Sequence, residues 1–145
     1  MKLALAALAA LACAAPLTAQ QNICVTQLAG SGCGPTLDVT FTPAGNAGNN
    51  KITISGTGLH ADGVGVMVWG TMPLNMPVFG DCFAYTDFIW GHRINIDASG
   101  SWIWSRSWPG SIQGSYRIQL ASVGLDGTGN LTIMTSDCVV ASCSL

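Results

Sequence analysis

Apolar and polar residues alternate along most of this chain in short segments that turn-forming residues separate. Apolar side chains occupy every second position over residues 37–41 and again over residues 52–54. The Gly- and Asn-rich segment 45–50 lies between them. A period of two places the apolar side chains on one face, as in a half-buried strand. The two segments are therefore predicted to pair as a hairpin around a turn at 45–50.

The same pattern continues to the end of the chain. A loop is predicted over residues 71–80, because Pro73 and Pro77 remove backbone donors that a central strand would need. About eight strands at intervals near ten residues, with no convincing helix, predict an all-β fold: an antiparallel β-sandwich, immunoglobulin-like or jelly-roll-like, with a small barrel as the alternative. The further strands are expected at residues 64–68, 82–90, 92–97, 101–108, 115–123 and 130–135.

The first 19 residues have the form of a secretory signal peptide. Lys2 precedes an apolar run that is too short to span a membrane, and small residues precede Gln20. We therefore expect residues 20–145 to form a single secreted domain, located outside the cell or at its surface. The alternative is a lipid anchor at Cys13, which follows Ala-Leu-Ala. No later segment is expected to span a membrane.

The composition excludes several classes of protein. Only 8% of the residues are charged while 49% are apolar, a balance that disfavours disorder. All seven acidic residues are aspartate, and glutamate is absent, which disfavours surface helices. The net charge of −2 and five scattered basic residues do not suit a nucleic-acid partner, since neutralising phosphates takes a basic cluster.

The cysteines predict disulfide bonds. An exported chain meets an oxidising compartment, where cysteines usually pair. An odd number follows the signal peptide, so at least one is unpaired or forms an intermolecular bond; these are Cys24, Cys33, Cys82, Cys138 and Cys143. No Cys-x-x-Cys pair is present, so a structural zinc site lacks its usual paired spacing. We expect no metal site and no cofactor.

Five segments resemble parts of two known families. Gly30–Leu37 (GSGCGPTL), Gly80-Asp81-Cys82 and Gly129-Asn130-Leu131 together resemble an uncharacterised family of short exported bacterial β-rich domains. Separately, residues 52–59 (ITISGTGL) and 97–102 (DASGSW) resemble phrases of bacterial immunoglobulin-like surface domains. Both resemblances imply a secreted β-sandwich, and neither implies a catalytic residue.

The first resemblance also implies a disulfide pairing. It implies that Cys33 pairs with Cys82. Cys24 then pairs with one of the two cysteines near the end of the chain, Cys138 or Cys143, and the other of the two stays unpaired.

The segment 101–108 is the densest candidate for ligand binding. Alternation along a strand places Trp102, Trp104, Arg106 and Trp108 on one face and serines with Ile103 on the other. In one interpretation the indoles fill the core, and Trp69 and Trp90 are likewise packing residues. Arg106 is the difficulty there, because a buried guanidinium needs a partner. In the other interpretation the face is open and sugar rings or another subunit stack on it.

Residues suited to catalysis are few. No glutamate and no Gly-x-Ser-x-Gly motif is present. Asp81, Asp87 and His92 lie close in sequence and could converge as a hydrolase site, but we prefer to interpret them as turn aspartates and an exposed imidazole. His60 is expected to be a solvated turn residue. Residues 126–130 faintly resemble a calcium loop, but Asp-Gly is equally a hairpin turn, which we prefer.

These observations predict a non-catalytic secreted or cell-surface module with a structural, self-assembly or adhesion role. Its partners would be further copies in a homo-oligomer or an extracellular polymer, because few charges protect the sheet edges. The alternative is a glycan-binding module whose exposed tryptophans bind a polysaccharide. A small secreted hydrolase is a further alternative.

Overall fold

The structure is a computed structural model that describes residues 23–43, 49–109 and 113–144. The predicted signal peptide and Cys13 lie outside the described residues, as does most of the turn predicted at 45–50. The described residues form strands and connections and contain no helix. In this part of the chain no helix is long and apolar enough to cross a membrane.

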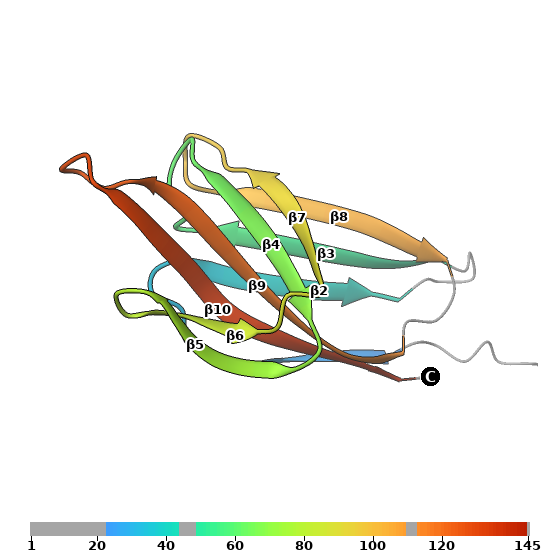
Figure 1. Cartoon of the computed structure of the whole chain (residues 1–145). Helices are drawn as coiled ribbons and strands as arrows, with labels where there is room; N and C mark the ends of the chain where they lie inside the picture. Colours follow the sequence, from blue (N-terminus) through green and yellow to red (C-terminus); the bar gives the residue numbers. More distant parts are fainter. Residues whose placement is uncertain (1–22, 44–48, 110–112, 145) are drawn as a thin grey trace, which may run out of the picture.

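The strands form three antiparallel sheets (Figure 1). A five-stranded sheet has the order β1-β10-β9-β4-β7, a three-stranded sheet has the order β2-β3-β8, and β5 pairs with β6 alone. The predicted all-β antiparallel sandwich is confirmed, with ten strands among the described residues where about eight were expected. The strands are β1 (Ile23–Leu28), β2 (Thr36–Thr42), β3 (Asn49–Thr57), β4 (Val64–Gly70), β5 (Pro73–Phe79), β6 (Cys82–Thr86), β7 (Trp90–Asn95), β8 (Trp102–Pro109), β9 (Gly114–Leu125) and β10 (Leu131–Ser144).

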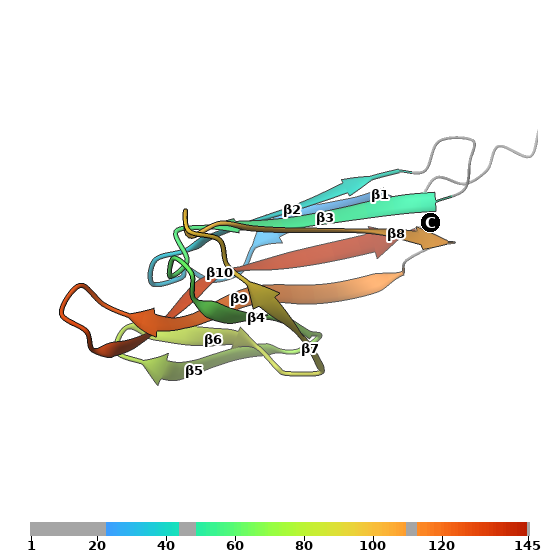
Figure 2. The ribbon, with the colours of Figure 1, turned by 90° about the horizontal axis from the view of Figure 1, so that it is seen from above.

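The sheets lie in three layers, which Figure 2 shows from above. The three-stranded sheet covers one face of the five-stranded sheet, and the β5–β6 hairpin covers part of the other. The core between the two larger sheets contains Ile54, Met67, Ile94, Ile118 and Leu120, all of them almost fully buried. Alternate residues of β2 and β3 point into this core, as the period of two predicted.

Gln119 connects the hairpin to the middle layer. Its side chain, only 4% exposed, points away from the core. The amide nitrogen donates to the carbonyls of Phe83 (2.9 Å) and Ser136 (3.0 Å), and the amide oxygen accepts the N–H of Tyr85 (2.9 Å). A side-chain amide has two donor hydrogens and two acceptor lone pairs, and these bonds use both donors and one of the acceptors.

The prediction of a loop over residues 71–80 is wrong, because Pro73–Phe79 form β5. Pro73 and Pro77 are tolerated because β5 pairs on one side only, and its register shifts next to both of them. The strand predicted at 82–90 is interrupted after Thr86, where the chain turns before β7. Strand β1 was not predicted, and β10 extends beyond its predicted end at residue 135 to Ser144.

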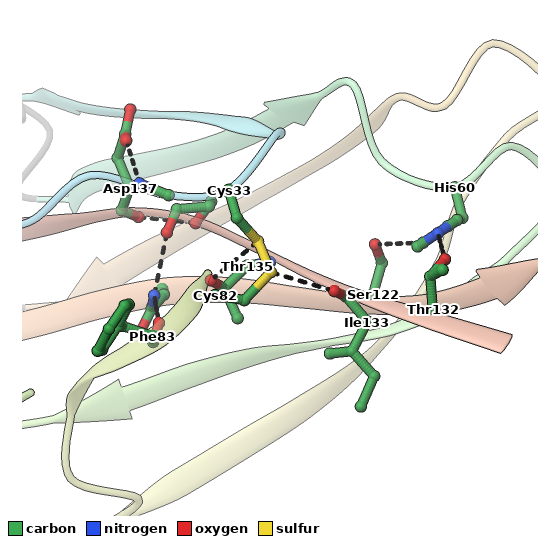
Figure 3. The surroundings of a disulfide bond; sticks show 12 residues. Cys33, His60, Cys82, Phe83, Ser122, Thr132, Ile133, Thr135 and Asp137 are labelled. Atoms are coloured by element: carbon green, nitrogen blue, oxygen red, sulfur yellow. Dashed lines mark hydrogen bonds between the residues drawn. A yellow bond between two sulfur atoms is a disulfide. The ribbon is translucent and has the colours of Figure 1, made fainter. Parts of the chain in front are cut away.

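The glycines of the segment 30–34 allow the chain to cross β10 at close range (Figure 3). A Cβ on Gly32 would lie 2.4 Å from the backbone of Ser136, and one on Gly30 would meet the ring of Tyr85. The Gly32 amide donates to Asp137 (2.7 Å), and the Cys33 amide donates to the Thr135 carbonyl (2.9 Å). This crossing lies at the bulge of β10 between residues 135 and 138.

The described residues contain two disulfides. Cys33 is bonded to Cys82, which is the pairing that the resemblance implied, and so fixes the crossing segment to β6. Cys24 is bonded to Cys143, across the paired strands β1 and β10. Cys138 is free and fully buried beneath the hairpin side of the sheet. Its burial raises the pKa of the thiol. The two disulfides are compatible with an extracellular location.

Candidate functional site

The two larger sheets separate at one end of the sandwich and leave a cleft of about 620 Å³. This is the end at which β2, β4 and β8 finish and β3, β7 and β9 begin (Figure 1). The volume lies within the range of small-molecule sites. The described lining residues are Phe41, Ile52, Trp69, Gly70, Thr71, Ile89, Trp90, Trp104, Arg106, Gln113 and Tyr116.

A chain of ring contacts runs through the walls of the cleft. Trp69 meets Trp90 and Tyr116 edge to face, with ring centroids 6.3 and 6.4 Å apart. Trp90 stacks on His92 at 5.8 Å, and His92 lies 6.3 Å from Trp104 on the opposite sheet. Both sheets therefore contribute aromatic rings, and these contacts hold the rings in place.

The corner between β4 and β5 positions two of these indoles. The Asp87 carboxylate accepts the amides of Thr71 and Met72, both at 2.7 Å. The hydrogen bond from Met72 contributes most to lowering the pKa of Asp87, and the one from Thr71 adds to it. The Ile89 amide donates to the carbonyl of Trp69 at 3.0 Å, which sets β7 beside β4.

The inward face of β8, which carries Trp102, Trp104 and Arg106, is neither wholly buried in the core nor wholly exposed. Trp102 and Trp104 are half-buried and pack against the core, while Ile103 on the other face is 71% exposed. Trp104 and Arg106 line the cleft. Along β8, the inward face therefore first packs against the core and then borders the cleft. Arg106 is exposed. The side chain of Trp108 lies outside the described ones.

Trp69 is a packing residue, as expected, since it packs against the core, whereas Trp90 is 45% exposed. Both also line the cleft. Sequence reasoning also missed Tyr116 and Gln113, whose backbone carbonyl accepts the Tyr116 hydroxyl at 2.7 Å. The signal available was the position of Trp69 and Trp90, each at the end of an alternating segment rather than within one.

The residues considered for hydrolysis do not converge. Strand β6 separates Asp81 from Asp87 by roughly 17 Å, the length of a five-residue strand. Asp81 lies in the β5–β6 turn, whereas the Asp87 carboxylate is bound to backbone amides and His92 stacks on Trp90. In the part of the chain that is described, no group of three His, Cys, Asp or Glu residues could hold a metal ion.

His60 is not the solvated residue that was expected. Its ring is partly buried, with Nδ1 3.0 Å from the Ser122 hydroxyl and Nε2 2.6 Å from the Thr132 hydroxyl (Figure 3). The imidazole thereby ties the β3–β4 connection to β9 and β10. Ser122 is fully buried, so its hydroxyl does not meet solvent.

The segment 126–130 is a hairpin turn, as expected. Asp126 accepts the Thr128 hydroxyl (2.7 Å) and the amides of Thr128 and Asn130 (2.8 and 2.9 Å). The hydrogen bond from the Thr128 hydroxyl contributes most to lowering the pKa of Asp126 to about 2.

Comparison of the chain with protein-family models, with curated proteins and with solved structures found no match. The cleft and its chemistry therefore carry the functional argument.

Proposed function

We propose that this protein is a non-catalytic extracellular module that binds a saccharide in the aromatic cleft. The observation that carries the proposal is the convergence of Trp69, Trp90 and Trp104 from both sheets on one cleft of about 620 Å³. Indole rings offer flat apolar faces for the C–H face of a sugar ring, and sugar hydroxyls can bond the polar edge of the site. Secretion, which the predicted signal peptide implies, belongs to this proposal.

Titration of the intrinsic tryptophan fluorescence with neutral and acidic oligosaccharides tests the proposal. Trp90→Ala removes the most accessible of the three indoles and is expected to weaken binding about tenfold, or about 1.4 kcal/mol. Phe88→Ala is the matched control, since Phe88 is an exposed aromatic residue that does not line the cleft. Absence of a response to every oligosaccharide would refute saccharide binding, and equal affinities for Trp90→Ala and the wild type would refute binding in this cleft.

Self-association is a second candidate function, and the exposed surface of β5 favours it. Every residue of β5 is exposed, and its apolar side chains include Leu74, Met76, Val78 and Phe79. Exposed apolar patches of this kind commonly mark protein interfaces. A second copy of this chain is the partner that we propose for it.

The molar mass in solution, measured by light scattering over a range of concentrations, tests this candidate. Met76→Lys is expected to shift the protein to monomer, because burying the charge at an interface is costly. Thr40→Lys adds the same charge to the exposed face of β2 and serves as the control. A wild-type protein that is monomeric at all concentrations contradicts self-association.

A further inference from the structure

Most of the described charged residues lie toward one or the other end of the sandwich. Strand register places three of the four described basic residues at the cleft end of the sandwich: Lys51 pairs with Thr42 at the end of β2, Arg106 pairs with Ile52 early in β3, and Arg117 pairs with Gly70 at the end of β4. Lys51 and Arg117 alternate with the lining residues Ile52 and Tyr116, so they contribute charge to this end without lining the cleft. Arg106 carries the only charge among the described lining residues.

Acidic residues collect at the opposite end. Four turns there each contain one aspartate, and Figure 1 shows these connections together at the end away from the cleft. They are Asp62, Asp81, Asp97 and Asp126. Asp87 is the acidic residue near the cleft, and its carboxylate is held by the Thr71 and Met72 amides. The cleft end is therefore the positive end of a molecule whose net charge is −2.

The position of Arg106 suits a sugar that carries an acidic group. Arg106 follows Trp104 by two residues on β8, so the two side chains share a face at a spacing of roughly 7 Å. A ring stacked on Trp104 would direct a substituent toward the guanidinium. This group has five N–H donors in a planar fork, so it can keep a protein contact and still bind a carboxylate.

We propose that the cleft prefers acidic saccharides, whose ring stacks on Trp104 and whose carboxylate binds Arg106. The proposal rests on the proposed saccharide-binding function and adds the charge of the ligand. Charge-assisted hydrogen bonds to arginine are stronger than neutral ones, and the positive end of the molecule favours the encounter with an anion.

A matched pair of ligands isolates the carboxylate. Trigalacturonate and its methyl ester have the same rings and linkages, but the ester has no charge. We expect the acid to bind about tenfold more tightly than the ester, by calorimetry or tryptophan fluorescence. Added salt should weaken binding of the acid and leave that of the ester unchanged, since ions screen the attraction.

Variants assign this preference to Arg106. Arg106→Gln should make the affinities for acid and ester equal, while Arg106→Lys should retain part of the difference because it keeps the charge without the fork. Arg93→Gln is the matched control: Arg93 is exposed on β7 and does not line the cleft. It should leave the preference unchanged. Near-ultraviolet circular dichroism checks that each variant is folded.

The outcomes separate this proposal from the function on which it rests. Equal wild-type affinities for acid and ester, or binding of neutral oligosaccharides alone, would overturn the acidic preference and leave saccharide binding standing. A preference that survives Arg106→Gln would overturn the role of Arg106. Competition by an oligoglutamate of equal charge would overturn the requirement for a sugar ring. No binding by any oligosaccharide would overturn both proposals.

Discussion

Replacing Gln119 by leucine is expected to lower the free energy of unfolding by about 3 kcal/mol. Leucine is close to glutamine in size, so the loss comes from hydrogen bonds rather than from a cavity. Three bonds disappear: two with the backbone of Phe83 and Tyr85 on β6, and one with the backbone of Ser136 on β10. Each bond contributes about 1 kcal/mol, and a buried partner left unsatisfied adds to the cost.

Urea unfolding with intact disulfides, followed by tryptophan fluorescence, measures this loss. Gln27→Leu is the matched control, because Gln27 lies exposed on β1 and its replacement should change the free energy of unfolding by less than about 0.5 kcal/mol. Hydrogen exchange should also rise in β6, where Tyr85 loses its acceptor. A surface substitution changes the free energy of unfolding by up to about 0.5 kcal/mol. If the value for Gln119→Leu lies within that range of the wild-type value, this side chain does not hold the hairpin.

Three further predictions concern single residues. Cys138 should react with Ellman's reagent only after unfolding, since the thiol is buried; reaction of the native protein would contradict this. The stabilisation from Asp126 should be complete above about pH 4 and lost as the pH falls toward 2, because hydrogen bonds lower its pKa from 3.8 to about 2 in the folded state. The urea midpoint of Asp126→Asn should therefore fall less over this range than that of the wild type, and equal falls would refute the assignment. Gly32→Ala should destabilise the protein by roughly 2 kcal/mol or more through contact with the β10 backbone, whereas Gly127→Ala, which points into open space, should be neutral in the same urea assay.

The alternating segments predicted most of the strands because one face of each is buried. Residues 37–41 and 52–54 show this directly, since their apolar positions point into the core. The pattern failed where one strand is covered on both faces or on neither. β10 is buried between the layers over much of its length and loses the alternation, and β5 is exposed throughout. Pro73 and Pro77 by themselves do not distinguish a loop from an irregular edge strand.

The cleft could be predicted only in part. Trp104 and Arg106 share a strand, so the period of two was enough to place them on one face. Trp69, Trp90 and Tyr116 join them only through the strand order β9-β4-β7 and through the packing of two sheets. Sheet order is set by contacts between distant parts of the chain, which a local pattern does not contain.

The two prolines of β5 bear on whether two copies would associate through backbone pairing or through side-chain contacts. Few charges protect the sheet edges, and this suggested pairing between edge strands of two copies. Pro73 and Pro77 lack the N–H that a further strand would need, so the β5 edge is protected without charge. Association at β5 would therefore bury side chains and leave the backbone ladder unchanged. Met76→Lys is the decisive variant for this reason, since it alters the apolar face while the edge keeps its prolines.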